Sequence, residues 1–218
     1  MTRIIIAAAG NGERWNNFRN TPKHLMTIEN EILLHRTYRQ FRGYTEDIVI
    51  IGIDERYQVG DARLEMPLDG DWLDFGKMYS SNHLWSNTRT IIVFGDVYFT
   101  DDAVKKIMSN QDQYKFFMRK GKSKYTGKGH KEIFAFAFDG GMNDKIKKNI
   151  EELIERKQGG AGAWRLYLHM QGFKQKSSYY VDYFNTDGYI EINDWTDDFD
   201  RSEDIIRWEK MRLKLGAK

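Results

Sequence analysis

The sequence predicts an α/β fold in which helices cover a parallel β-sheet. Three observations support this. An apolar run at Ile4–Ala8 leads directly into a glycine turn, short apolar runs then alternate with helical patterns, and the chain is long enough to bury a sizeable core. With 218 residues, of which 40% are hydrophobic, we expect one domain spanning residues 1–218.

Each strand expected in the first half is a short, nearly continuous apolar run, which is typical of a strand covered on both faces. These runs are Ile4–Ala8, Asp47–Ile53, Thr90–Phe94 and Tyr114–Met118. The segments between them have helical spacing of apolar residues: Ile32–Phe41, Gly76–Trp85 and Asp101–Met108. Either Thr100 or Asp101 is the expected N-cap of the third helix.

The second half changes character, because strands and helices no longer alternate regularly. We expect strands at Glu132–Phe138, Ser178–Phe184 and Tyr189–Ile192, and helices at Asn143–Arg156, Ala163–Met170 and Ser202–Leu213. The charged helix Asn143–Arg156 has an apolar stripe made of Ile146, Ile150, Leu153 and Ile154. Ser202 is the expected cap of the last helix, and Gly159–Gly162 is expected to be a flexible loop.

Composition excludes several classes of protein. The formal net charge of +2 is too balanced to indicate a nucleic-acid partner, and the absence of cysteine excludes disulfides and thiolate metal sites. The first apolar run is too short for a signal peptide or a membrane span, so we expect a cytoplasmic location without a membrane partner. Spacings typical of zinc sites, serine hydrolases and P-loop kinases do not occur.

The glycine turn after the first strand has the composition of a phosphate-binding loop. Gly10 and Gly12 let the backbone approach a ligand closely, and successive N–H groups in such a turn bind anions. Arg14 and Lys23 add positive side chains for phosphate oxygens. Two glycines alone also fit an ordinary tight turn, so the prediction depends on the whole string.

Asp96 is the first acidic candidate, because it follows the expected strand Thr90–Phe94 directly. Ligands of open α/β sheets bind beyond the carboxyl ends of the strands, where Gly10 and Gly12 are also expected. A carboxylate at this edge can hold Mg²⁺ beside bound phosphates. The alternative is an aspartate that only caps a turn.

Read as a string, residues 4–25 resemble the signature L-A-A-G-X-G-T-R-[LM]…P-K-X-L of sugar-phosphate nucleotidyltransferases. The matching residues are Gly10, Gly12, Arg14, Pro22, Lys23 and Leu25, whereas Glu13 and Trp15 depart from the signature. The resemblance implies a three-layer, Rossmann-like α/β/α fold with a mixed, mostly parallel sheet, of the nucleotide-diphospho-sugar transferase type. It also implies a nucleotide-binding loop made of Ala8, Ala9, Gly10, Asn11, Gly12 and Lys23.

Three further segments carry the resemblance. The Gly95-Asp96 pair resembles the segment whose aspartate binds the metal in this family. The string Asp200-Arg-Ser-Glu-Asp204-Ile205 resembles a D-X-P-E-D-L pattern whose first aspartate is the second metal ligand, which makes Asp200 the candidate and Asp198 the second choice. A loose match before the Gly-Asp strand places Ser81 or Asn82 near the nucleotide.

The resemblance therefore implies a Mg²⁺-dependent nucleotidyltransferase that acts on an NTP and a phosphorylated sugar or alcohol. Arg14 and Lys23 would be its catalytic cations, and Asp96 and Asp200 its metal ligands. The alternatives are a nucleotide-sugar-dependent glycosyltransferase of the related GT-A fold and a nucleotide-binding module without catalysis. We expect the lysine-rich loop Lys120–Lys131 to be mobile and, with Gly159–Gly162, to border the acceptor side; an ordinary solvated surface loop is the alternative.

Overall fold

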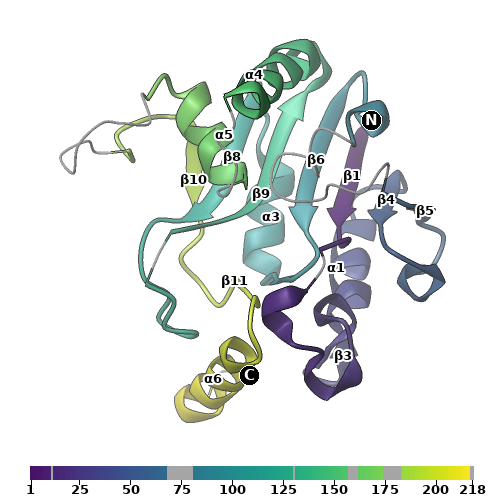
Figure 1. Ribbon diagram of the computed structural model, residues 1–218, viewed down its shortest axis with the longest axis vertical. Coiled ribbons are helices and arrows are strands. Elements are labelled where there is room, and N and C mark those ends of the chain that lie inside the picture. The colour runs from purple at the N-terminus through teal and green to yellow at the C-terminus, as the bar shows by residue number, and fades with distance from the viewer. Residues whose placement is uncertain (11, 68–80, 130, 157–161, 174–182, 217–218) are drawn as a thin grey trace.

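The computed structural model describes the chain except for residues 11, 68–80, 130, 157–161, 174–182 and 217–218. Its described residues form a seven-stranded sheet with the strand order β10-β8-β9-β6-β1-β4-β5 (Figure 1). In chain order these strands are β1 (Thr2–Ala7), β4 (Ile48–Ile51), β5 (Arg63–Glu65), β6 (Arg89–Phe94), β8 (Tyr114–Arg119), β9 (Glu132–Asp139) and β10 (Tyr189–Glu191).

The sheet is mixed and mostly parallel, as the family resemblance implied. Strand β1 pairs in parallel with β4 and β6, β4 pairs in parallel with β5, and β10 pairs in parallel with β8. Strand β9 alone among these seven runs the other way, because it is antiparallel to both β6 and β8. The amino end of β9 therefore lies at the edge where β1 and β6 end.

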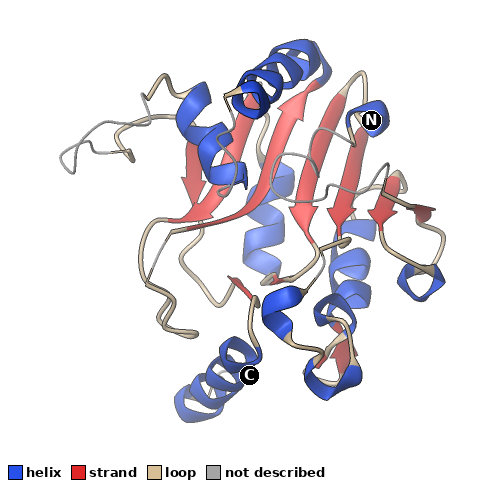
Figure 2. Cartoon of the chain, in the orientation of Figure 1, coloured by secondary structure: helices blue, strands red, loops and turns tan. Residues whose placement is uncertain are grey.

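Helices cover both faces of the sheet (Figure 2). Alternate residues of β1 serve the two faces: Ile4 and Ile6 share a core with α1 (Leu33–Arg42) and α3 (Asp101–Ser109), whereas Ile5 shares a core with α4 (Asn143–Glu155) and α5 (Gly162–Met170). This arrangement confirms the α/β class with three layers.

A small third core lies beyond the sheet. The last helix, α6 (Ser202–Leu215), buries Ile205 and Trp208 against Trp15, which follows the glycine turn. Two short strand pairs complete the description: β2 (Thr27–Ile28) with β3 (Glu31–Ile32), and β7 (Val97–Tyr98) with β11 (Asp197–Asp198). Figure 1 shows α6 beyond the ends of the central strands, close to the segment that follows β1.

Several expected boundaries are corrected. Ile154 is 45% exposed and does not belong to the buried stripe of α4. Residues 82–84 form only a short 3₁₀ helix, and Tyr183 and Phe184 lie in a turn rather than a strand; residues 76–80 and 178–182 of these expected elements are outside the described part of the chain. Most of the expected Gly159–Gly162 loop is also outside it, and Gly162 begins α5.

Of the two helix caps expected from the sequence, one is confirmed and one is corrected. Thr100 caps α3, since its hydroxyl accepts a hydrogen bond from the Ala103 N–H at 3.0 Å. Ser202 is the first residue of α6 rather than its cap, which is Arg201. The Asp204 carboxylate accepts the N–H groups of Arg201 and Asp200, at 2.9 and 3.1 Å, and so fixes the entrance of the helix. None of the described helices is long and apolar enough to cross a lipid bilayer.

Candidate active site

The glycine turn follows β1 and is clamped against the end of β6. The Ala8 N–H donates to the Ile51 carbonyl at 2.9 Å, and the Gly95 N–H donates to the Ala7 carbonyl at 2.9 Å. A Cβ atom on Gly95 would lie 2.9 Å from the Cβ of Ala8, so only glycine permits this close approach. Gly12 has a φ of 62°, in the left-handed region that favours glycine.

Ala8 and Ala9 are buried, so their side chains belong to the core and only their backbone could meet a ligand. Asn11, the fourth residue of the expected loop, is outside the described residues. Trp15, which departs from the family signature, is 2% exposed, and its indole donates to the Thr21 carbonyl at 2.8 Å. This hydrogen bond joins the two ends of the segment of residues 15–21, which connects the glycine turn to Lys23.

Lys23 lies between two carboxylates from distant parts of the sequence. Its ammonium forms an ion pair with Asp96 and lies 3.6 Å from the Asp200 carboxylate. Arg14 reaches the same Asp200 carboxylate at 3.1 Å. The four residues that the sequence assigned to catalysis and metal binding therefore lie together at the carboxyl ends of β1 and β6.

The pairing of β7 with β11 brings Asp200 to this place. Asp198 is opposite Val97 in the antiparallel register, and the Phe199 N–H donates to the Asp96 carbonyl at 3.0 Å. Because side chains alternate along an extended segment, Asp198 and Asp200 point to the same side. Both contact the ammonium of Lys128, which also lies 3.3 Å from Asp204.

Two members of this cluster were not identified from the sequence. Lys128 is nearly buried, although it belongs to a loop expected to be mobile and solvated. Glu132 is close enough to Asp198, Asp200 and Asp96 for their charges to act on it. It opens β9, the reversed strand, and this direction could not be read from residue patterns.

The cluster contains more acidic than basic side chains. Five carboxylates (Asp96, Glu132, Asp198, Asp200 and Asp204) face three cations (Arg14, Lys23 and Lys128). Burial raises the pKa of Asp198 to about 7 against the lowering effect of Lys128, and burial with neighbouring carboxylates raises the pKa of Glu132. Burial alone would lower the pKa values of Lys23 and Lys128, but the surrounding carboxylates raise both. A cation bound beside Asp198 and Glu132 would favour the ionised forms of both carboxyl groups.

The loop before β9 is held by a buried carboxylate, so residues 123–128 are not a fully solvated surface loop; the expected mobility stays a prediction. Asp197 is fully buried, pairs with Arg119, and accepts hydrogen bonds from the hydroxyls of Ser123 and Thr126. Ser123 and Thr126 are themselves buried. This network fixes the path of the chain that leads to Lys128.

The cluster borders a pocket of about 470 Å³, lined by Arg14, Lys128, Asp200 and residues at the start of α6. The proposed nucleotide contacts at Ser81 and Asn82 stay predictions. Ser81 is 2% exposed, and its hydroxyl accepts a hydrogen bond from the indole of Trp85 at 3.3 Å.

Comparison with solved structures identifies the class of this fold. The chain is similar to a provisionally named glucose-1-phosphate thymidylyltransferase from Bacillus anthracis, with a TM-score of 0.64, 14% identity, and coverage of 97% of this chain and 95% of that chain. It is similar to the CTP:phosphocholine cytidylyltransferase of Streptococcus pneumoniae, with a TM-score of 0.61, 16% identity, and coverage of 98% and 99%.

A third match is the inositol-1-phosphate CTP transferase of T. maritima, with a TM-score of 0.63, 12% identity, and coverage of 97% of this chain and 96% of that chain. No family model and no curated protein matches the sequence of this chain. At 12–16% identity these likenesses show the fold alone. The chain has the fold of the nucleotidyltransferases that act on sugar phosphates and related alcohol phosphates, as the sequence resemblance implied.

The donor set at the site fits a hard divalent cation. Asp96 and Asp200 offer carboxylate oxygens, and their side chains keep 19% and 17% exposure. The buried Asp198 has one oxygen, Oδ1, without a hydrogen-bond partner. Among the described residues, no group of three or more His, Cys, Asp or Glu side chains could hold a metal ion by itself. Mg²⁺ commonly takes one or two carboxylates together with phosphate oxygens and water, so Asp96 and Asp200 are adequate for it.

Proposed function

We propose that this protein is a Mg²⁺-dependent nucleotidyltransferase that joins an NTP to a phosphorylated sugar or alcohol. The observation that carries the proposal is the convergence of Arg14, Lys23, Asp96 and Asp200 beside the glycine turn. These residues come from four separate segments, and packing alone does not require two cations and two carboxylates at this edge. A cytoplasmic location belongs to the same proposal.

In the proposed reaction, an oxygen of the acceptor phosphate attacks the α-phosphorus of the NTP. A new bond forms between that oxygen and the α-phosphorus, the bond from the α-phosphorus to the oxygen bridging to the β-phosphorus breaks, and pyrophosphate leaves with the bonding electrons. Such a transfer needs positioning and charge neutralisation more than a nucleophilic side chain.

The glycine turn and the charged side chains beside it supply the positioning and the charge neutralisation that the reaction needs. The backbone around Gly10 and Gly12 binds phosphate oxygens, and Arg14 holds the β- and γ-phosphates. Lys23 pairs with Asp96 in the free protein and neutralises charge at the α-phosphate when the nucleotide is bound. Asp96 and Asp200 would hold Mg²⁺, which neutralises phosphate charge when bound.

The competing glycosyltransferase reading loses support at Tyr98, where an Asp-X-Asp motif would have its second aspartate. Tyr98 is 3% exposed, its hydroxyl donates to Glu29, and its ring lies under Arg36 at 4.4 Å. This is a packing role. The cations Arg14 and Lys23 lie beside Asp96 and Asp200, and this combination favours catalysis over a module that only binds a nucleotide.

The direct test incubates the protein with each of the four common NTPs, Mg²⁺ and a panel of sugar and alcohol phosphates, and measures pyrophosphate release. We expect release that requires NTP, acceptor and Mg²⁺ together. A parallel incubation replaces the NTPs with nucleotide sugars and adds a panel of sugar and alcohol acceptors. Transfer of the sugar to an acceptor, with release of the nucleotide and no pyrophosphate, would establish the glycosyltransferase alternative. Binding of NTP without any turnover across the panel would support the non-catalytic module.

Asp96→Asn should weaken Mg²⁺-dependent NTP binding about tenfold or more, which corresponds to about 1.4 kcal/mol. The reason is that an amide is a poorer Mg²⁺ ligand than a carboxylate. Calorimetric titration with and without Mg²⁺ measures this, with the exposed Asp187→Asn as the matched control. Melting temperature should change little. NTP binding that is indifferent to Mg²⁺ in the unaltered protein would refute the metal assignment.

Asp200→Asn should reduce turnover far more than Asp194→Asn. The Asp194 carboxylate is engaged elsewhere, since it accepts the Thr100 hydroxyl and the Thr196 N–H at 2.8 Å each. Asp200 instead faces Lys23 and Arg14. Turnover of both variants and of Asp198→Asn is measured at saturating and limiting Mg²⁺. A large loss in Asp198→Asn with normal Asp200→Asn and an unchanged melting temperature would move the second ligand to Asp198.

A further inference from the structure

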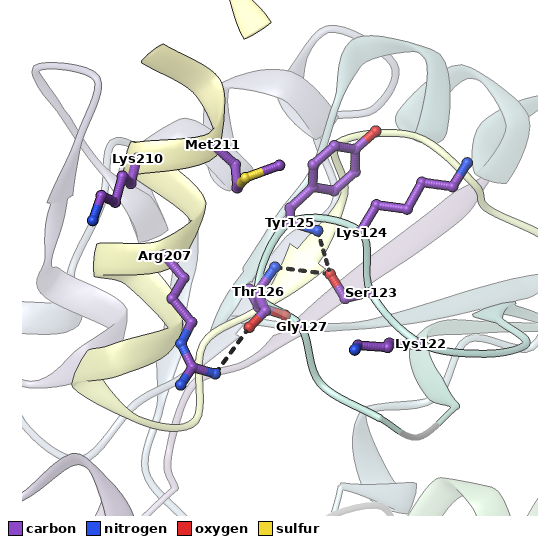
Figure 3. Close-up of a pocket in the computed structure, with 9 residues that line it drawn as sticks. All are labelled: Lys122, Ser123, Lys124, Tyr125, Thr126, Gly127, Arg207, Lys210 and Met211. Carbon is purple, nitrogen blue, oxygen red and sulfur yellow. Dashed lines mark hydrogen bonds between the residues drawn. The ribbon is translucent and has the colours of Figure 1, made fainter. Parts of the chain in front are cut away.

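A second pocket, of about 670 Å³, lies between the loop of residues 122–127 and one face of α6. Figure 3 shows loop residues on one side and Arg207, Lys210 and Met211 on the other, with Lys124 and Lys210 extending outward in opposite directions. The lining contains four cationic side chains, Lys122, Lys124, Arg207 and Lys210, and none of the lining residues is acidic. This concentration stands out in a chain with a net charge of +2.

The floor of this cationic pocket is held in place. The Ser123 hydroxyl accepts the N–H groups of Tyr125 and Thr126, at 3.0 and 2.9 Å, and donates to the buried Asp197. The Tyr125 ring stacks on Trp195 with centroids 3.7 Å apart. Arg207 donates to the Thr126 carbonyl at 3.4 Å and so links the loop to α6 (Figure 3). A fixed floor with exposed cationic side chains at its rim suits an anionic ligand that arrives from solvent.

The cationic pocket adjoins the candidate active site. Arg207 lines both this pocket and the smaller one that contains Arg14, Lys128 and Asp200. A ligand whose one end lies beside Asp200 can therefore extend past Arg207 between the loop and α6. The Tyr125 ring and Met211 offer apolar surface for its organic part, and the rim lysines attract a negative charge at its far end.

We propose that the cationic pocket binds a second anionic group of the acceptor, remote from the phosphate that reacts. This deepens and rests on the proposed function: the acceptor class becomes phosphorylated sugars or alcohols with an additional phosphate or carboxylate. The ligand chemistry follows from the cations, because ammonium and guanidinium groups form charge-assisted hydrogen bonds with either anion.

The test measures equilibrium binding and needs no turnover. Glucose 1,6-bisphosphate and glucose 1-phosphate are titrated into the full chain by calorimetry at fixed ionic strength. We expect the bisphosphate to bind about tenfold tighter, a difference of about 1.4 kcal/mol, and we expect this preference to weaken with added salt. The variant Lys122→Gln/Lys124→Gln/Lys210→Gln should bind both compounds equally.

A triple variant of exposed lysines on other helices, Lys105→Gln/Lys106→Gln/Lys148→Gln, removes the same net charge and should keep the preference. Equal binding of the two compounds to the unaltered protein, or a preference that persists in the pocket variant, would overturn the proposal. The pyrophosphate assay distinguishes failure of the proposed function from failure of this proposal. If no pyrophosphate is released but the bisphosphate preference still depends on the three lysines, the pocket binds anions on a protein with another activity.

Discussion

Lys23→Ala should reduce the rate of nucleotidyl transfer by about 10²- to 10³-fold while the protein remains folded. The ammonium is positioned by Asp96 and Asp200 at the end of β6. A positive charge at this place stabilises the transition state more than the ground state, because charge on the transferring phosphate is redistributed as the bond breaks. The effect should therefore be larger on kcat than on the KM for NTP.

Steady-state kinetics with saturating Mg²⁺ measures this loss, and the exposed Lys105→Ala serves as the control. Melting curves of both variants serve to check that they are folded. If Lys23→Ala turns over at a rate close to that of the unaltered protein, Lys23 is only a structural partner of Asp96 and is not a catalytic residue.

Asp197→Asn should destabilise the protein by about 3–5 kcal/mol, because it leaves a buried guanidinium without its counter-charge. Asp197 is fully buried against Arg119, and it also accepts the hydroxyls of Ser123 and Thr126. Urea unfolding gives the change in the free energy of unfolding. The exposed Asp187→Asn should change it by less than about 0.5 kcal/mol.

A stability loss for Asp197→Asn as small as that of the control would mean that the loop of residues 122–127 is held by other contacts. Activity gives a second measure of the same role. At a temperature where the variant is still folded, its turnover should fall, because the network fixes the chain that leads to Lys128.

The α/β class and most elements could be predicted because the apolar patterns are strong and local. Strand β1 and helix α3, with its Thr100 cap, are each determined by the residues of one short segment. The sequence also predicted that Asp96 and the glycine turn lie at the same edge of the sheet, and the Gly95 N–H, which donates to the Ala7 carbonyl, lies at this edge.

Long-range contacts explain what could not be predicted. Lys128 lies in a lysine- and glycine-rich segment that is locally indistinguishable from a solvated loop, and its burial depends on Asp197 and Asp198 about seventy residues later. The position of Glu132 depends on the reversal of β9, which only the sheet pairing reveals. Asp200 was the candidate from the sequence resemblance, but its place beside Lys23 depends on the β7–β11 pairing, which is also a long-range contact.

The central claim is that the chain transfers a nucleotidyl group to an acceptor phosphate. Its most direct measurement follows phosphorus NMR signals during incubation with an NTP, Mg²⁺ and the acceptor selected by the pyrophosphate screen. The account predicts equal amounts of pyrophosphate and of a new diphosphate-bridged product, with no formation in Lys23→Ala on the same timescale. Conversion of the NTP to NDP and orthophosphate, without a bridged product, would contradict it.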